Sequence, residues 1–296
     1  MEHITVCVCT YKRPWLLQRL FEELRAQRTD GLFSYSIVVA DNDREESAKE
    51  AVTNFAATCL VKTVYCVEPV ANIARARNKV VSNAEGDYLA FIDDDEFPGK
   101  DWLLVMWKAL NAHKVDGVLA PVLPFFEPGT PQWIVKAGFY DRARHETGFV
   151  MGWQECRTGN VLIRRRLVEG IDEVFNPEFG AQGEDQDFFR RMIEKGCKFI
   201  WCDEAPAYEV VPPHRCERRF LLKRALLRGT TTFRHRRNLA KNLVKSLIAV
   251  PLYALALPFL LILGHHYFMR YLVRLCDHLG RLLAVVNLNP VKERTN

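Results

Sequence analysis

The chain has 296 residues, of which 49% are hydrophobic and 26% charged, a composition that excludes an intrinsically disordered protein. This length accommodates one large domain, or one domain with an appendage. The net charge of +5 is uneven, because residues 215–245 hold eleven Lys or Arg and a single acid, which leaves a net −5 on the remainder. Nine scattered cysteines lack paired zinc-ligand spacing, so we expect them all to be reduced. The N-terminus lacks an apolar signal core, so we expect the N-terminal part to stay in the cytosol.

Residues 1–120 alternate between strand and helix patterns. Strands are expected at 4–9, 35–40, 61–67, 88–92 and 115–120, and helices at 15–28, 47–58, 72–84 and 102–112. Regular alternation of this kind implies right-handed crossovers and a mostly parallel sheet covered by helices. The predicted fold class is therefore α/β, a nucleotide-type sandwich, and a further helix is expected at 184–195.

Four carboxylates at residues 93–96 directly follow the apolar run 88–92, at the expected end of a buried strand. Adjacent carboxylates repel each other and resist desolvation, so this pattern favours a shared cation. Oxygen ligands in a partly open site suit Mg²⁺ or Mn²⁺, which also take phosphate oxygens. The alternative is a solvated acidic turn, or a cap for the helix that starts near Asp101.

Polar residues also follow the first two expected strands, at 9–14 and at Asp41. Asp41 would accept a hydrogen bond from the N3–H of a pyrimidine, and Tyr11 would stack on the base, although the Asp-Asn-Asp run also suits a simple turn. The chain contains no Gly-rich phosphate loop, which argues against dinucleotide oxidoreduction and P-loop hydrolysis.

An ordered set of motifs covering roughly residues 3–230 resembles the family 2 glycosyltransferases, which have a GT-A fold with a Rossmann-like, mostly parallel sheet. Within that family the chain is similar to the succinoglycan-type exopolysaccharide glucosyltransferases. The motifs are CTYKRP (9–14), VADN (39–42), NIARARN (72–78), FIDDDE (91–96), PQW (131–133), TGNVLIRR (158–165), GEDQDFF (183–189) and EVVPPHR (209–215).

The resemblance implies a nucleotide-sugar site and a metal site. Asp93 and Asp95 would form the Asp-x-Asp pair, and Asp95 is the expected direct ligand of Mg²⁺ or Mn²⁺. Some relatives carry a His where this chain has Tyr208, and His214 lies out of register, so metal ligation by His stays open. The residues implied for the uracil, ribose and diphosphate of a UDP-sugar are Thr10, Tyr11, Arg13, Asp41, Arg77, Asp93 and Asp94.

The acidic pair at 184–185 begins an expected helix, where capping would explain both residues. The resemblance favours Asp185 over Glu184 as the general base for the acceptor hydroxyl. Asp187 would cap the helix or support the site. Trp133 and Trp153 would stack on acceptor sugars, unless they are core residues. Asn160, Arg215, Arg224 and Arg228 complete the expected contacts with acceptor or diphosphate.

A run of seventeen residues at 247–263 is apolar, interrupted by Pro251 and Pro258, and a second helical pattern follows Gly264. As a helix the run spans about 26 Å, slightly less than a ~30 Å hydrocarbon core. We expect a kinked hairpin or re-entrant membrane anchor. A single membrane span and a long core helix are the alternatives. The basic run before it would bind anionic headgroups or a lipid diphosphate, and it lacks the interleaved aromatics of a nucleic-acid site.

The sequence thus predicts a GT-A domain at 1–230 and a basic linker with a membrane-associating helical segment at 231–296. The predicted function is inverting transfer of a hexose from a UDP-sugar to a polyprenyl-diphosphate-linked saccharide, at the cytoplasmic face of the inner membrane, for a surface polysaccharide. Loops between 121 and 182 would set the choice of sugar. The alternatives are a nucleotidyltransferase on a similar sheet and a non-catalytic membrane scaffold with a degenerate transferase domain. The sequence does not indicate the oligomeric state.

Overall fold

The computed structural model describes residues 1–180, 183–234, 239–285 and 288. The chain divides into two compact units. Unit 1 comprises residues 1–124 and 142–209, and unit 2 comprises residues 125–141 and 210–296. The functional boundary expected at residue 230 stays a prediction.

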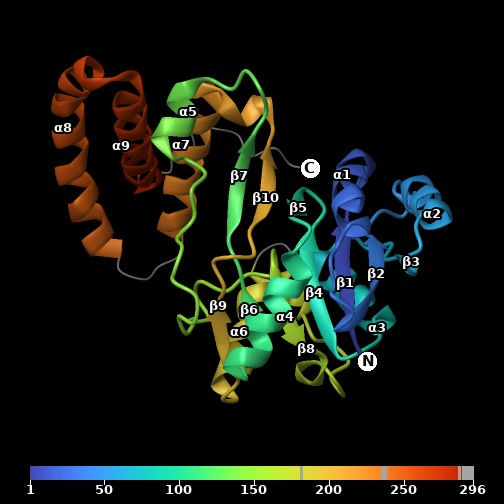
Figure 1. Ribbon diagram of the computed structural model, residues 1–296. Helices are drawn as coiled ribbons and strands as arrows, with labels where there is room; N and C mark the ends of the chain where they lie inside the picture. The colour runs from blue at the N-terminus through green and yellow to red at the C-terminus, as the bar shows by residue number, and fades with distance from the viewer. Residues whose placement is uncertain (181–182, 235–238, 286–287, 289–296) are drawn as a thin grey trace. The chain divides into compact units, whose positions relative to one another are not determined.

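Unit 1 is built on a seven-stranded sheet with the order β3-β2-β1-β4-β8-β6-β9 (Figure 1). All neighbouring strands are parallel except β8, which runs antiparallel to both β4 and β6. The mostly parallel α/β sheet and its five expected strands are confirmed, whereas β8 and β9 were not expected. The strands are β1 (Glu2–Thr10), β2 (Phe33–Asp41), β3 (Thr63–Val67), β4 (Tyr88–Asp93), β6 (Gly117–Leu119), β8 (Val161–Arg164) and β9 (Phe199–Trp201).

Helices cover both faces of this sheet, which explains why its strands are continuous apolar runs. On β1, Ile4, Val6 and Val8 pack on one face against α1 (Pro14–Arg25), α2 (Lys49–Thr58) and α4 (Trp102–His113). Cys7 points to the other face, where α3 (Ile73–Asn83) and α6 (Glu184–Glu194) pack. The five helices expected in this unit are therefore present, and all nine cysteines are free.

Helix α3 is fixed at its start by a side-chain cap. Asn72 Oδ1 accepts a hydrogen bond from the Arg75 backbone N–H at 3.1 Å. The Asn72 amide also donates to the carbonyl of Pro177 at 3.0 Å, in the short 3₁₀ helix η2 (Pro177–Phe179). A second 3₁₀ turn, η1 (Arg165–Leu167), follows β8. The cap matters for function because the next turn of α3 carries Arg77.

A second, three-stranded sheet has the order β5-β10-β7, formed by β5 (Glu96–Pro98), β10 (Ala207–Val211) and β7 (Val122–Phe126). The boundary between the units falls within β7 and β10. Strand β5 differs from the alternative interpretation of residues 93–96 as a solvated turn. Glu96 instead begins a buried strand and lies opposite Glu209 of β10.

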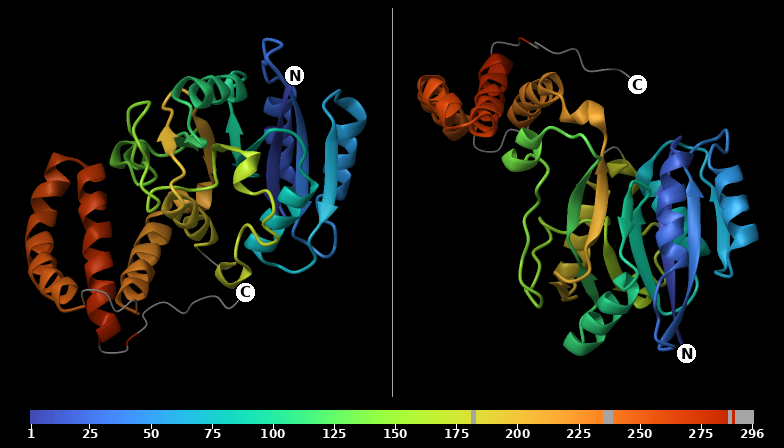
Figure 2. Two further views of the ribbon diagram at one scale, coloured as in Figure 1. Left: turned by 90° about the horizontal axis from the view of Figure 1, so that it is seen from below. Right: turned by 45° about the horizontal axis from the view of Figure 1, so that its top comes forward.

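Unit 2 consists mainly of helices: α5 (Gln132–Ala137), the 3₁₀ turn η3 (Pro213–Cys216), α7 (Arg218–Arg234), α8 (Leu239–Leu263) and α9 (His265–Val285). Helix α9 packs against both α7 and α8 (Figure 2). The α7–α9 crossing is close, because a Cβ added at Gly280 would lie 2.2 Å from the carbonyl oxygen of Leu226. Asp277 of α9 pairs with Arg228 of α7 at 2.8 Å.

Helix α8 runs without a break through Pro251 and Pro258, so the prolines do not divide the apolar run as expected. Each proline removes only one backbone donor, and the neighbouring turns keep their hydrogen bonds. Within residues 242–263, the most apolar 18-residue stretch has a mean hydropathy of 2.4, and only 6% of it is buried. Among the described residues this is the one helix that is long and apolar enough to cross a membrane. Its exposure argues against the core-helix alternative.

Candidate functional site

The ends of three parallel strands bring expected site residues to one edge of the sheet in unit 1. Thr10 ends β1, Asp41 ends β2 and Asp93 ends β4. In the sheet register Thr10 lies opposite Asp41, and Cys9 lies opposite Asp93. Ligands of α/β sheets bind outside the carboxyl ends of the strands, so this edge is the candidate site.

Asp94 is almost fully buried at this edge and is held by two donors. The Thr10 hydroxyl donates to Oδ2 at 2.7 Å, and the Arg13 guanidinium donates to Oδ1 at 2.5 Å. The same guanidinium reaches Asp95 Oδ2 at 3.1 Å, which joins the two carboxylates. Burial raises the pKa of Asp94 to about 7, against the opposing effect of Arg13. Thr10 and Arg13 thus organise the acidic turn.

Glu96 adds a further buried carboxylate, which we had not expected as a site residue. Its Oε2 accepts from the Asp93 backbone N–H at 3.3 Å. Burial, and then the negative charge of Asp93, raise the pKa of Glu96 well above its usual range. A Cβ at Gly159 would lie 2.8 Å from Glu96 Oε1 and 3.2 Å from Asp93 Oδ2, so only glycine fits there without a shift. Glu96 lies in the FIDDDE motif and Gly159 in the TGNVLIRR motif. The motifs were therefore the sequence signal that could have identified these two residues.

Arg77 links this acidic turn to helix α6. Its guanidinium forms a buried ion pair with Glu184, the first residue of α6, and lies 3.6 Å from Asp93 Oδ1. Glu184 is 6% exposed, so its charge depends on Arg77 for compensation. Arg77 thus connects Asp93 of the acidic turn with Glu184 of the other acidic motif, and its expected contact with the ribose or diphosphate stays a prediction.

Replacing Arg77 with Gln should destabilise the protein by about 3–5 kcal/mol, because Glu184 would keep a buried charge without a partner. The Arg77→Gln/Glu184→Gln double variant should recover much of this loss. Urea denaturation measures both values. Arg190→Gln is the matched control, since Arg190 pairs with Asp187 on the surface of α6 and its loss should cost about 1 kcal/mol or less. Equal effects in Arg77→Gln and Arg190→Gln would contradict the prediction.

Asp185, the expected base, lies one residue further along α6. Its Oδ1 accepts from the Gln186 backbone N–H at 2.7 Å, and its Oδ2 lies 4.0 Å from Arg157 Nε. Its side chain is 15% exposed, so it retains access to solvent. Asp187 instead pairs with Arg191 of its own helix at 2.8 Å, and its expected capping or supporting role stays a prediction. The preceding residues 181–182 lie outside the described part of the chain.

Two expected contact residues are engaged in holding the protein together. Asp41 is fully buried and accepts from the Ala48 N–H at 2.7 Å and the Tyr65 hydroxyl at 3.0 Å. It also accepts from the Asp43 N–H at 3.1 Å, which is the turn chemistry given as the alternative to uracil binding. Asn160 is equally buried, and its amide binds the Trp102 indole and two backbone carbonyls.

The remaining expected residues are placed as follows. Tyr11 is 45% exposed beside the acidic turn, with the Lys12 ammonium 5.4 Å from its ring centroid. Tyr208 of β10 stacks on Phe97. Trp133, Arg215, Arg224 and Arg228 belong to unit 2, together with His214. There Trp133 packs against Phe139 and His265, and Arg215 accepts a hydrogen bond from Tyr140 at its carbonyl.

The acidic turn has the chemistry of a divalent-cation site but not a complete ligand shell. Within the described residues no three His, Cys, Asp or Glu side chains converge as a full ligand set. A cation shared with a diphosphate needs only one or two carboxylates from the protein. Asp93 and Asp95 offer carboxylate oxygens at the edge of this turn, where Arg77 lies 3.6 Å from Asp93 and Arg13 lies 3.1 Å from Asp95. The donor set therefore fits Mg²⁺ or Mn²⁺.

A mostly parallel sheet with helices on both faces and an acidic turn after β4 is the architecture of the GT-A fold. Solved structures of TarS from S. aureus show the same fold, with TM-scores of 0.56 for the complex with UDP and 0.55 for the complex with UDP-GlcNAc. They share 16% and 14% sequence identity with this chain. The first covers 100% of this chain and 95% of its own, and the second covers 99% and 94%.

The sequence comparisons identify the family. The model of glycosyl transferase family 2 matches residues 5–171. The succinoglycan biosynthesis protein ExoM of Rhizobium meliloti is 35% identical over 244 residues, which span 81% of this chain and 76% of ExoM. The chondroitin synthase of Escherichia coli is 23% identical over 72% of this chain and 35% of its own length. The chain belongs to glycosyl transferase family 2, so it is a glycosyltransferase, as the motifs predicted.

Proposed function

We propose that the protein is an inverting, metal-dependent glycosyltransferase that moves a hexose from a UDP-sugar to a polyprenyl-diphosphate-linked saccharide. The observation that carries the proposal is the connection between two acidic motifs through Arg77, which contacts Glu184 beside the candidate base and lies near Asp93. The names of the relatives support the donor and the pathway. TarS was solved with UDP and with UDP-GlcNAc, and ExoM is named for succinoglycan biosynthesis.

In this proposal, different residues act on the acceptor hydroxyl and on the leaving diphosphate. Asp185 accepts the proton of the acceptor hydroxyl while that oxygen attacks the anomeric carbon from the face opposite the departing diphosphate, which inverts the configuration. Arg77 holds Glu184 and thereby the start of helix α6, which carries the base. Its guanidinium also supplies positive charge near Asp93, where the diphosphate leaves.

The acidic turn has the role of holding the cation and the nucleotide. Asp93 and Asp95 would hold Mg²⁺ or Mn²⁺, which acts as a Lewis acid on the leaving diphosphate. Thr10 and Arg13 keep Asp94 and Asp95 in place, and Tyr11 offers an exposed ring for the base. Asp41 would select the uracil, which requires its carboxylate to accept one bond beyond the three that it already makes.

Membrane association completes the proposal. The exposed apolar side chains of α8 and the basic residues of α7 suit a bilayer with anionic headgroups. A cytoplasmic location of unit 1 would give it access to nucleotide sugars and to the headgroup of a lipid-linked acceptor. The basic residues at Arg224 and Arg228 would then lie near the lipid diphosphate.

The test is product analysis with purified full-length protein in membranes that contain lipid-linked saccharides. We expect radiolabel from one UDP-sugar of a panel to enter the lipid fraction, with release of UDP and only in the presence of Mg²⁺ or Mn²⁺. Release of pyrophosphate would establish the nucleotidyltransferase alternative. Failure to bind UDP with Mn²⁺ in calorimetry would favour the non-catalytic scaffold.

A further inference from the structure

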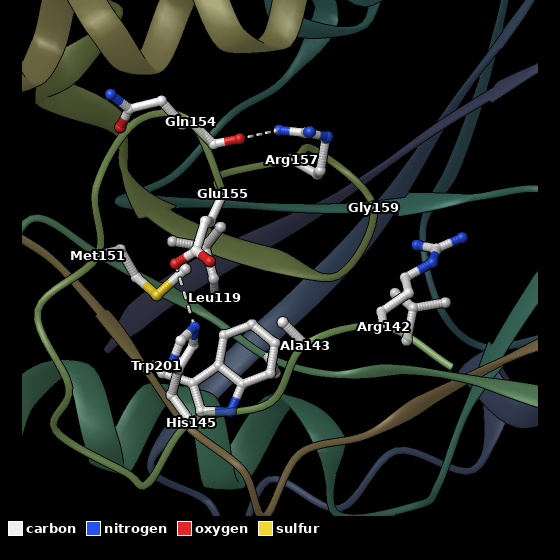
Figure 3. Close-up of a pocket in the computed structure, with 12 residues that line it drawn as sticks. Leu119, Arg142, Ala143, His145, Met151, Gln154, Glu155, Arg157, Gly159 and Trp201 are labelled. Carbon is white, nitrogen blue, oxygen red and sulfur yellow. Dashed lines mark hydrogen bonds and ion pairs between the residues drawn. The ribbon is translucent and has the colours of Figure 1, made fainter. Parts of the chain in front are cut away.

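A pocket of about 270 Å³ lies in unit 1 beyond the ends of β6 and β9 (Figure 3). Its apolar wall includes Leu119 of β6, Trp201 of β9 and Met151. The loop segment between residues 142 and 159 forms most of the remaining wall. At this volume the pocket is small for a drug-sized ligand and suits one ring-sized group.

Charged side chains line the opening of this pocket. Glu155 and His145 point toward one another across it, with His145 Nε2 3.2 Å from Glu155 Oε2 (Figure 3). The His145 ring is held in place, because it stacks on Phe149 at 4.1 Å and meets the edge of Trp201 at 5.6 Å. The Glu155 side chain is 49% exposed and offers a carboxylate to a ligand. An apolar wall with a few placed polar groups is the common design of a small-ligand site.

Two residues that line the pocket also lie near residues with a role in the proposed reaction. Arg157 lies 4.0 Å from the carboxylate of Asp185, the candidate base. Gly159 is in close approach to Asp93 and Glu96 of the acidic turn. A group that contacts Arg157 in the pocket is therefore separated from the candidate base by one side chain, and Gly159 connects the same pocket to the acidic turn.

We propose that this pocket holds the terminal pyranose of the acceptor saccharide, with Glu155 and Arg157 hydrogen-bonding its hydroxyl groups. The proposal rests on the proposed function and adds the place where the acceptor saccharide binds. Sugar rings combine apolar C–H faces with hydroxyls at their rims, which matches the Trp201 wall and the charged opening. The acceptor, rather than the donor sugar, occupies the pocket because Arg157 connects it with the base that must receive the acceptor proton.

The test uses the purified full-length protein in detergent, saturated with UDP and Mg²⁺. Methyl α- and β-glycosides of glucose and galactose serve as probes, and saturation-transfer NMR detects their binding. We expect at least one glycoside to bind to wild type and to bind about tenfold more weakly to Glu155→Ala, because a charged hydrogen bond is lost. Glu146→Gln, an exposed acid of the same segment that does not line the pocket, is the matched control and should match wild type.

Calorimetry with UDP, UDP-glucose, UDP-galactose and UDP-N-acetylglucosamine tests whether the pocket binds the acceptor sugar or the donor sugar. The proposal requires equal affinities of wild type and Glu155→Ala for all four. Weaker binding of a UDP-sugar with unchanged binding of UDP would place the donor sugar in the pocket and overturn the proposal. Glycoside binding that is absent from wild type, or unaffected in Glu155→Ala, would also overturn it. Failure of wild type to bind UDP would instead overturn the proposed function, and the glycoside measurement, repeated without UDP, would then decide the pocket.

Discussion

Replacing Asp185 with Asn should lower the rate of sugar transfer by about 10²–10⁴-fold, the usual contribution of a positioned general base. Asn keeps the size of the side chain and its acceptor oxygen, so the hydrogen bond from the Gln186 N–H at the start of α6 is retained. The protein should therefore fold and bind UDP as wild type does. Initial rates of label transfer and calorimetric UDP affinity measure the two properties separately.

The matched control for Asp185→Asn is Glu194→Gln, which removes an exposed carboxylate from the other end of the same helix. Its transfer rate should equal that of wild type. Near-normal turnover in Asp185→Asn would remove the base role from Asp185. Glu184 would then be the next residue to replace, although its ion pair with Arg77 means that such a variant also changes stability.

Under the proposed function, replacing Asp95 with Ala should reduce transfer by about 10²–10³-fold, because Asp95 would be a ligand of the cation that stabilises the departing diphosphate. The Asp94–Arg13 contact at 2.5 Å remains in this variant, so the turn should keep its fold. Transfer rates measured as a function of Mn²⁺ concentration check the prediction. The variant should need more Mn²⁺ than wild type for half-maximal activity.

Metal removal from wild type gives the complementary result. A chelator should abolish transfer, and added Mg²⁺ or Mn²⁺ should restore it. The control variant for Asp95→Ala is Asp101→Asn, which should need no more Mn²⁺ than wild type. Asp101 pairs with Arg28 at 3.2 Å on the surface and does not touch the acidic turn. Full activity of wild type in the chelator would refute the role of the cation, whatever the activity of Asp95→Ala.

Much of the candidate site was predictable because it depends on local patterns. The run 88–92 is apolar throughout, as a strand buried on both faces must be, and the acids follow where that strand ends. The helix with Glu184 and Asp185 begins after Gly183, whose φ of +99° suits a glycine at a helix start.

Other parts of the site were not predictable from spacing. Asp94 lies between the two residues of the Asp-x-Asp pattern, yet it is the carboxylate that Thr10 and Arg13 both bind. Asp41 was expected to contact the uracil, which stays a prediction, and the structure shows its buried carboxylate accepting from N–H groups of its own turn and from Tyr65. The burial of a side chain depends on which distant residues pack over it. The residues next to it in the sequence do not indicate which residues these are.

The order of strands and helices, and with it the meeting of Thr10, Asp41 and Asp93 at one edge, follows from patterns in the amino-acid sequence. Parallel strands joined by helices must all end on the same side of the sheet. The tertiary structure alone decided the Arg77–Glu184 ion pair, formed across 107 residues of chain. The antiparallel β8 and the pocket lined by Arg157 and Trp201 likewise depend on it. Such contacts follow from how distant segments pack and from the side chains that remain in reach, and no local periodicity encodes that result.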